Sequence, residues 1–345
     1  MYDSNNISVS PTEIDQKILD SFGRKHEYLR ISLTERCNLR CTYCMPEQGI
    51  QLRDKSHFMR NEEVFEMASI FVGLGIKKIR LTGGEPLVRK GVDNIITDLG
   101  GLNTELTIST NGILVDQFID NFKKAGIKSV NVSLDSLKPG RQELITRRNY
   151  YDRIRRNIDL LLEEGFAVKI NIVVMKNIND DELIDFIELS KDKPLHIRFI
   201  EFMPFNGNNW SWDKGIGLAE MMNTFSDRYG VESILKIQEE ANSTAKCFAI
   251  DGYAGTFGII SSVTNPFCST CNRIRVTADG KMKNCLFSSE ETDLLNPLRR
   301  GENIIPLILQ GISNKKAIRA GMESFDDLSN PTNFEKNRNM ITIGG

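Results

Sequence analysis

Two patterns alternate along the first 205 residues of the chain: short apolar runs and longer stretches with one apolar face. The apolar, β-branched runs predict six strands, at residues 28–33, 77–82, 105–110, 129–134, 168–174 and 196–202. Between them, apolar residues recur at helical spacing, most clearly in residues 61–75 and 151–165. Six strand–helix units in a row predict a parallel sheet with right-handed crossovers. Their number fits a barrel or partial barrel better than a short open sheet.

The strand–helix rhythm fades after about residue 205. Residues 205–215 form a polar break rich in Gly and Asn, and the pattern beyond it is irregular. We therefore expect a polar N-terminal arm at 1–24, an α/β core at 25–205, and a second domain or capping extension at 206–345. Within the core, Asp180 and Asp181 are expected to cap and open a helix.

Composition narrows the class of protein. Charged residues make up 26% of the chain but the net charge is only −2, so no overall basic field attracts nucleic acid or a membrane surface. The sequence contains no apolar run of about 18 residues, so no membrane-spanning helix is predicted. The N-terminal residues show neither a signal-peptide nor a transit-peptide pattern. We expect a cytoplasmic protein, or a mitochondrial-matrix protein if the chain is a processed eukaryotic one.

The seven cysteines are odd in number and tightly grouped, which favours metal ligation over disulfides in a chain without an export signal. Cys37, Cys41 and Cys44 are spaced C-x3-C-x2-C, directly after the first predicted strand. Structural zinc sites need four ligands, and a [4Fe–4S] cluster normally takes four thiolates. Three thiolates on a cluster would leave one iron open to another ligand. A zinc site, or a cluster completed by a remote residue, stays open on spacing alone.

The first triad and its surroundings resemble the radical S-adenosylmethionine (SAM) superfamily. The resemblance rests on the cysteine spacing with an aromatic residue at Tyr43, and on the sequence TGGEP at 82–86, which ends the second predicted strand. It implies an incomplete TIM-like (β/α)6 barrel and a [4Fe–4S] cluster whose open iron binds SAM. It also implies a SAM pocket formed by Tyr43, Gly84, Glu85, Ser133, Asn171 and Met203. By residue type alone, several of these would serve equally well in backbone hydrogen bonding or core packing.

A second triad, Cys268, Cys271 and Cys285, has the spacing C-x2-C-x13-C, and the remaining Cys247 is expected to be a buried free thiol. With this triad, the sequence CNRIR at 271–275 and a final Gly-Gly, residues 25–345 resemble the GTP 3′,8-cyclases of molybdenum cofactor biosynthesis. That resemblance implies two [4Fe–4S] clusters, the second of which holds the guanine edge of GTP. A SAM-derived 5′-deoxyadenosyl radical would remove the 3′ hydrogen of GTP, and the sugar radical would attack guanine C8. The terminal glycines, Gly344 and Gly345, would reach into the active site.

Cationic side chains interrupt four of the otherwise apolar predicted strands. Burying such charges unpaired is costly, so each must reach solvent, pair with an acid or meet a bound anion. The residues alone leave ion pairs and a polyphosphate equally open. The family resemblance favours GTP, because arginine and lysine suit its phosphate groups. On that resemblance the GTP-binding residues are Arg30, Arg80, Ser109 (where the family typically has threonine), Lys169, Arg198, Arg273, Ile274 and Arg275.

The resemblance also implies partners: a reducing electron donor of flavodoxin or ferredoxin type, the cyclic pyranopterin monophosphate synthase as the next enzyme, and a second copy of the chain in a homodimer. Two other interpretations stay open. One is a different radical SAM enzyme with two clusters, such as a peptide-modifying enzyme. The other is a non-enzymatic iron–sulfur or zinc protein. Metal analysis separates the last of these, because two four-iron clusters hold about eight irons.

Overall fold

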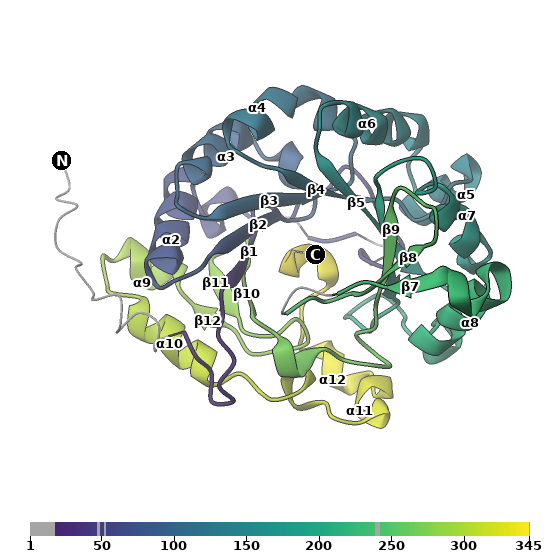
Figure 1. The fold of residues 1–345 in the computed structure, drawn as a ribbon. Coiled ribbons are helices and arrows are strands. Elements are labelled where there is room, and N and C mark those ends of the chain that lie inside the picture. Colours follow the sequence, from purple (N-terminus) through teal and green to yellow (C-terminus); the bar gives the residue numbers. More distant parts are fainter. Residues whose placement is uncertain (1–17, 47–48, 52, 239–241, 345) are drawn as a thin grey trace.

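The computed structural model describes residues 18–46, 49–51, 53–238 and 242–344. Its framework is one curved sheet of twelve strands, in the order β12-β11-β10-β1-β2-β3-β4-β5-β6-β9-β8-β7 (Figure 1). The sheet wraps around a central space, with most helices on its outer face. Its outermost strands, β12 and β7, lie at opposite ends of this order, so the barrel formed by the described residues is incomplete.

The six predicted strands form the middle of the sheet, all parallel, which confirms the predicted fold class. The boundaries differ from the expected ones by at most one residue. These strands are β1 (Tyr28–Ser32), β2 (Lys78–Thr82), β3 (Glu105–Thr110), β4 (Ser129–Ser133), β5 (Ala167–Val174) and β6 (His196–Glu201). Because all six run in the same direction, the loops that follow them meet at one end of the barrel.

The C-terminal part of the chain extends this sheet at both edges. β9 (Thr256–Ile260) pairs parallel with β6, and β10 (Arg273–Val276) pairs parallel with β1. Beyond them lie antiparallel strands: β8 (Lys246–Ile250) and β7 (Ile234–Lys236) at one edge, β11 (Lys281–Lys283) and β12 (Thr292–Asp293) at the other. The irregular sequence pattern after residue 205 did not predict these strands.

Helices cover the outside of the six central strands (Figure 1). In α6, for example, Ile154, Ile158 and Leu161 are buried on one face, as helical spacing predicts. The helices of this region are α2 (Asn61–Gly73), α3 (Val92–Gly100), α4 (Ile119–Lys124), α5 (Pro139–Thr146), α6 (Tyr151–Glu163) and α7 (Leu183–Glu188).

The expected N-cap at Asp180 and Asp181 is wrong. Both residues lie inside a 3-10 turn, Asp180–Glu182, whose N-cap is Asn179, and α7 begins only at Leu183. Asp181 instead forms ion pairs with Lys138 and Arg141 on the neighbouring segment.

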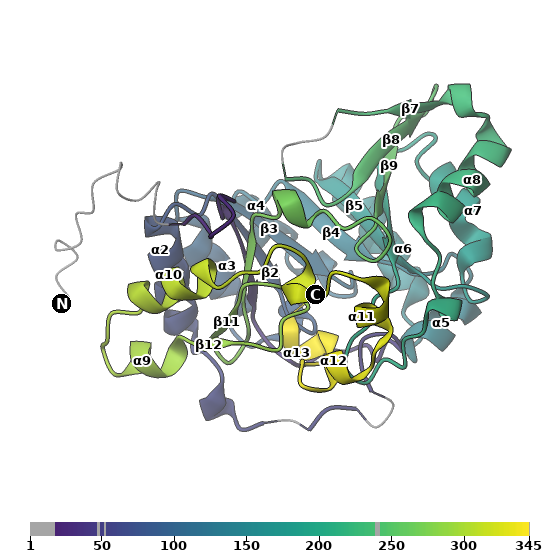
Figure 2. The same cartoon turned by 90° about the horizontal axis from the view of Figure 1, so that it is seen from below.

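The last helices bring the end of the described chain into the barrel. The C-terminal helices are α8 (Leu218–Tyr229), α9 (Leu295–Arg299), α10 (Ile305–Ser313), α11 (Phe325–Ser329), α12 (Thr332–Glu335) and α13 (Met340–Ile343). Figure 2 shows α11, α12 and α13 grouped near the C-terminus, which lies at the centre of the sheet's curve in Figure 1.

Candidate active site

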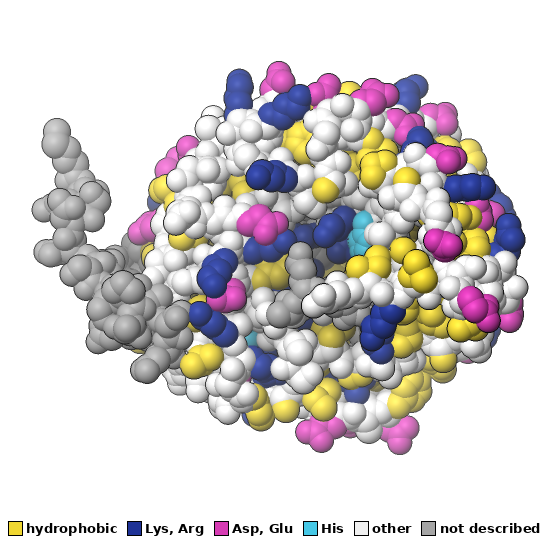
Figure 3. Space-filling model, viewed as in Figure 1, with side chains coloured by type: hydrophobic (Ala, Val, Ile, Leu, Met, Phe, Trp, Pro, Cys, Tyr) yellow, Lys and Arg dark blue, Asp and Glu magenta, His cyan; other side chains and the backbone are white. Residues whose placement is uncertain are grey.

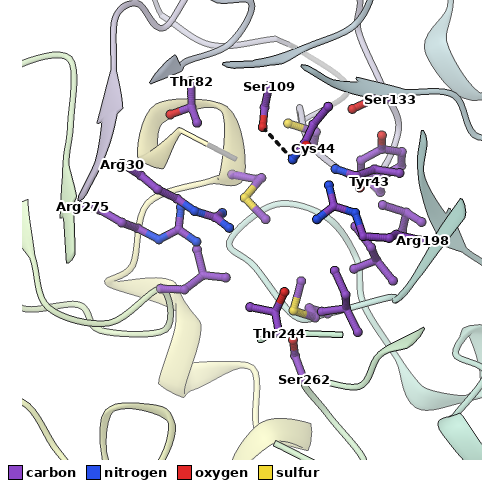
Figure 4. Close-up of a pocket in the computed structure, with 18 of the residues that line it drawn as sticks. Arg30, Tyr43, Cys44, Thr82, Ser109, Ser133, Arg198, Thr244, Ser262 and Arg275 are labelled. Carbon is purple, nitrogen blue, oxygen red and sulfur yellow. Dashed lines mark hydrogen bonds between the residues drawn. The ribbon is translucent and has the colours of Figure 1, made fainter. Parts of the chain in front are cut away.

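One cavity inside the barrel is lined by both cysteine triads. The thiols of the first triad come from the loop after β1, and those of the second come from the segments on either side of β10 and β11. The close-up in Figure 4 shows Arg30 and Arg275 on one side of this cavity and Arg198 on the other. The sequence separates the triads by more than 220 residues, and the fold joins them because β10 pairs with β1. The cysteines lining the cavity are Cys37, Cys41, Cys44, Cys268, Cys271 and Cys285.

The first triad is half-buried and lies near the carboxylates of Glu85 and Asp135. Burial raises the pKa of Cys37 to about 11, and burial together with the neighbouring Cys37 and Asp135 raises that of Cys44 further. Thiols in such a place become thiolates only against a strong local positive charge, which the irons of a cluster supply. The Cys37 sulfur also accepts hydrogen bonds from the Leu39 amide at 3.3 Å and from Asn111 Nδ2 at 3.9 Å.

The second triad has a more positive environment. Burial alone would raise the pKa of Cys271, but the charges of Arg273 and Lys315 and hydrogen bonds from both residues lower it to about 6. The pKa of Cys268 is raised, mainly by burial. The neighbouring cations therefore favour the thiolate form of Cys271 in the second triad.

Each triad offers three thiols that could hold a metal cluster. Among the described residues, no group of three or more His, Cys, Asp or Glu side chains is arranged to hold one metal ion. A four-iron cluster spreads its thiolate ligands more widely than one ion does, and it can be held by three thiolates with one iron left open. Three thiols from each triad line a common cavity, and each set could hold a cluster with one iron left open.

The residues predicted for SAM surround the first triad. Gly84 packs so tightly that a Cβ there would lie 2.4 Å from the carbonyl oxygen of Arg36, next to the first cysteine. The Tyr43 hydroxyl donates to Asp135 Oδ2 at 2.9 Å, which fixes the ring beside Cys44. Asn171 Oδ1 is buried and has no hydrogen-bond partner among the described residues, so it offers an acceptor to a ligand. Ser133 and Met203 also line the cavity.

Glu85 lies outside the described lining of the cavity. Burial raises its pKa to about 7. Its carboxylate accepts hydrogen bonds from Thr110 Oγ1 at 2.8 Å, the Asn111 amide at 2.7 Å and the Leu87 amide at 3.1 Å. Glu85 thus ties the loop after β2 to the loop after β3, and its predicted contact with SAM stays a prediction.

Arginines form a continuous row across three strands. Arg30 is the register partner of Arg80 on β2 and of Arg275 on β10. Arg198 faces them from β6 (Figure 4). Lys and Arg side chains also gather around the centre of the face seen in Figure 3. Like charges in adjacent register repel one another, so this row is costly without an anion.

Among the residues that the structure describes, no carboxylate is one of the main charges acting on three of these arginines. The charges that act on Arg30, Arg198 and Arg275 come from other arginines, from Tyr28 and from cysteines. Burial, followed by the charge of Arg80, lowers the pKa of Arg198 to about 9. Its Nε and Nη2 atoms, and Nη2 of Arg273, are buried without a hydrogen-bond partner among the described residues. This arrangement favours a bound polyphosphate over four separate ion pairs.

Of the other residues predicted to bind GTP, only some line the cavity. Ser109 lines the cavity and accepts a hydrogen bond from Arg80 Nη1 at 3.3 Å. Arg80 itself, Lys169 and Ile274 lie outside the described lining, and the Ile274 side chain is in the hydrophobic core. The structure therefore leaves their predicted contacts with GTP as predictions.

Gly344, the first of the two C-terminal glycines, contacts residues at the same end of the barrel. Gly344 has a positive φ of 89°, and a Cβ there would lie 2.7 Å from Ser32 and 2.8 Å from Thr82 Oγ1, so glycine is required. Its carbonyl accepts a hydrogen bond from Arg275 Nη1 at 2.8 Å. The other predicted tail residue, Gly345, lies outside the described residues.

The sequence analysis did not predict several residues that line the cavity. Asn131, Thr244, Ser262 and Arg319 all line the cavity. Asn131 lies in β4, opposite Ser109 in register, and an asparagine inside an apolar strand was an available signal. Thr244 and Ser262 come from irregular segments and Arg319 from a short 3-10 turn, Arg319–Gly321, and none of them lies in a recognisable motif.

Comparison with known sequences decides the family. The sequence model described as Radical SAM superfamily matches residues 31–190, and that described as Molybdenum Cofactor Synthesis C matches residues 195–320. The chain is 44% identical over 343 residues to the Arabidopsis thaliana protein named GTP 3′,8-cyclase, mitochondrial, covering 98% of this chain and 86% of that protein. The chain belongs to the GTP 3′,8-cyclase family of radical SAM enzymes. Family membership confirms SAM and iron–sulfur clusters as its cofactors.

Other relatives agree with this family. The GTP 3′,8-cyclase of Peptoclostridium acidaminophilum is 44% identical over 303 residues, covering 86% of this chain and 92% of that protein. Molybdenum cofactor biosynthesis protein 1 of Mus musculus is 45% identical over 334 residues, but the match covers 95% of this chain and 51% of that protein. The chain thus spans about half the length of that relative.

The fold also matches a solved structure. The crystal structure of Streptococcus suis SuiB bound to S-adenosylmethionine superimposes with a TM-score of 0.63 at 14% identity, covering 82% of this chain and 65% of that chain. At this identity the match shows a common fold. None of the described helices has the length and apolar character needed to cross a membrane.

Proposed function

We propose that this chain converts GTP to (8S)-3′,8-cyclo-7,8-dihydroguanosine 5′-triphosphate, the first step of molybdenum cofactor biosynthesis. The observation that carries the proposal is the single cavity that brings two cysteine triads and a row of unbalanced arginines together. The first triad would hold the cluster that binds SAM, and the second would hold the cluster that binds guanine. The arginines would bind the triphosphate of GTP. Family membership supports this division.

In this proposal Cys37, Cys41 and Cys44 hold the first [4Fe–4S] cluster, beside the SAM site. The close approach of Gly84 to the loop that carries Cys37 holds the loop after β2 against the first triad, where SAM would bind. Tyr43, fixed by Asp135, and Asn171, with its free buried acceptor, would orient the bound SAM. When bound and reduced, this cofactor pair supplies a 5′-deoxyadenosyl radical, which the family uses to remove the 3′ hydrogen of GTP.

Cys268, Cys271 and Cys285 hold the second [4Fe–4S] cluster, and its open iron would take the guanine edge. Arg30, Arg198, Arg273 and Arg275 would bind the triphosphate, since the first three have buried N–H groups without a partner among the described residues, and such groups suit phosphate oxygens. Holding both ends of GTP fixes the ribose between them. The 3′ carbon and guanine C8 are then already held in the relative orientation that the reaction needs.

The tail helps to enclose the reacting groups. The hydrogen bond from Arg275 to the Gly344 carbonyl places the end of the described chain against β1 and β2. Enclosure excludes water and hydrogen donors that would quench a carbon radical. The residues thereby position and enclose GTP, while the cofactors supply the redox chemistry.

Family membership also suggests protein partners, an oligomeric state and a cellular location for this reaction. We propose a low-potential donor of flavodoxin or ferredoxin type as the electron source and the cyclic pyranopterin monophosphate synthase as the next enzyme. A homodimer, and a location in the cytoplasm or the mitochondrial matrix, belong to the same proposal. The Arabidopsis relative is named as mitochondrial, which supports the second location.

The test is turnover of the anaerobically reconstituted, dithionite-reduced chain. SAM is supplied with and without GTP, and 5′-deoxyadenosine and the nucleotide are followed by mass spectrometry. We expect GTP-dependent 5′-deoxyadenosine and an isomer of GTP in equal amounts. SAM cleavage with unchanged GTP would support another radical SAM enzyme with two clusters. A loaded, reduced protein that leaves SAM intact would favour the non-enzymatic interpretation.

A further inference from the structure

Lys315 lies directly against the second triad. It follows α10 and is almost fully buried, with 3% of its surface exposed. Its Nζ atom donates hydrogen bonds to the sulfur of Cys271 at 3.3 Å and to the carbonyl oxygen of Arg273 at 2.9 Å. These contacts hold a primary amine against one cysteine sulfur and away from solvent.

A second buried cation keeps the segment around Lys315 in place. The Arg24 guanidinium donates to the carbonyl oxygens of Cys268, Lys316 and Ala317, each at 2.8 Å. It thus joins the first cysteine of the triad to the two residues that follow Lys315. Arg24 in turn is paired with the buried carboxylate of Asp20 at 2.5 Å.

Asp20, Arg24 and Lys315 are not among the residues that line the cavity. Asp20 and Arg24 belong to the stretch that the sequence predicted to be a polar arm, yet both are buried. Burying Asp20, Arg24 and Lys315 costs free energy, and the observed hydrogen bonds offset part of that cost. Together these contacts hold Lys315 Nζ in place against the Cys271 sulfur.

We propose that Lys315 is a positioning and tuning residue for the second cluster: its hydrogen bond to the Cys271 sulfur raises the reduction potential of that cluster. The inference rests on the proposed second cluster. The potential of an iron–sulfur cluster depends on its net charge, its solvent exposure and the hydrogen bonds to its sulfurs. Reduction adds one electron from an external donor to the cluster, with no bond made or broken. A nearby N–H donor and positive charge stabilise the electron-richer, reduced form.

The experiment is a redox titration of the reconstituted full chain, followed by electron paramagnetic resonance. Wild type is compared with Lys315→Met, which removes the donor, and Lys315→Arg, which retains a cationic donor. Lys316→Met is the matched control, because the Lys316 side chain is exposed while its carbonyl, bound by Arg24, is unchanged. The titration is repeated with Cys37, Cys41 and Cys44 changed to Ala, so that the second cluster contributes alone.

We expect Lys315→Met to lower the reduction equilibrium constant at least tenfold, which is about 59 mV for a one-electron couple. Lys315→Arg should recover most of this change, and Lys316→Met should match wild type. An unchanged potential in Lys315→Met with full iron content would overturn the inference. An equal change in Lys316→Met would also overturn it, since the effect would then not depend on the contact.

Two outcomes separate this inference from the proposed function. If Lys315→Met fails to hold the second cluster, Lys315→Leu, which also removes the donor, replaces it in the titration under the same criteria. If wild type itself binds only about four irons, the proposed second cluster and the inference both fail. If wild type binds about eight and only the potential shift is missing, the inference alone fails.

Discussion

Arg30 on β1 and Arg275 on β10 lie directly opposite each other on two neighbouring parallel strands. Arg80 continues the row on the other side of Arg30. Burial is the main cause that lowers the pKa of Arg30, and the neighbouring arginines lower it further. Three like charges in register destabilise the fold when nothing neutralises them, and the proposed binding of an anion would remove this cost.

Replacing Arg30 by Met should weaken GTP binding while leaving stability intact. A lost hydrogen bond to a charged group costs about 1.5–3 kcal/mol, which predicts at least a tenfold loss of affinity. The removal of a like charge should offset the lost packing, so thermal stability should not fall. Isothermal titration with GTP and a thermal melt measure the two effects.

Arg153→Met is the control for this change, because Arg153 pairs with Asp116 on the outer surface. It should bind GTP as wild type does. Unchanged GTP affinity in Arg30→Met would contradict the assignment of the arginine row to the triphosphate.

Gly84→Ala should prevent assembly of the first cluster. The added Cβ would lie 2.4 Å from the Arg36 carbonyl oxygen, so the loop carrying Cys37 would have to move. Iron content should fall from about eight to about four per chain. Gly140→Ala is the control, since a Cβ there meets nothing within 4 Å and Gly140 lies in α5, where alanine favours the helix. Full iron content in Gly84→Ala would refute the steric argument.

His26 should make stability fall in mild acid. The residue is fully buried, and burial, followed by the charge of Lys315, lowers its pKa from 6.5 to about 4. The unfolded chain therefore binds the proton more readily than the folded chain between these pH values. Its contribution is present above pH 6.5 and is lost as the pH falls to about 4, amounting to at most about 3 kcal/mol.

The measurement is the thermal midpoint between pH 7.5 and 4.5 for wild type and His26→Gln. Glutamine keeps an N–H donor for Asp20, which His26 Nε2 contacts at 3.1 Å, but does not titrate. The pH dependence should be shallower in the variant, because other titrating groups remain. Parallel curves for the two proteins would show that His26 does not titrate in this range.

Arg338 should hold the tail segment in place. Its guanidinium donates to Asp279 at 2.9 Å and to Glu291 at 2.5 and 2.7 Å, immediately before α13. Breaking a buried ion pair from one side costs about 3 kcal/mol, so Arg338→Met should speed amide exchange in residues 338–344 by roughly 100-fold. Hydrogen-exchange mass spectrometry measures this. Arg300→Met, which breaks an exposed pair with Glu302, should change nothing there, and equal protection in both variants would contradict the role.

The sequence was sufficient for the six central strands because each is a local apolar run between recognisable helices. The two flanking parallel strands could not be predicted in the same way. β10 is only four residues long, RIRV, and its partner β1 lies about 240 residues earlier in the chain. Such long-range pairing leaves no local pattern, although it is what joins the two triads.

The candidate site was likewise predictable where a motif carried it. The six cysteines and the glycines of TGGEP were predicted from motifs that resemble the family, and the structure places all of them on the lining of one cavity. Arg24 and Lys315 could not be predicted in this way, because each acts through contacts with distant backbone carbonyls or a distant sulfur. Glu85 shows the opposite case, since the motif is present but its carboxylate is used to join two loops.

The most direct test of the central claim uses GTP that carries deuterium at the 3′ carbon of the ribose. The reduced, reconstituted chain is given this GTP with unlabelled SAM, and the 5′-deoxyadenosine formed is weighed by mass spectrometry. The account predicts one deuterium in 5′-deoxyadenosine for each molecule of cyclised nucleotide, because one cavity holds SAM and GTP together. Unlabelled 5′-deoxyadenosine accompanying the same product would contradict it.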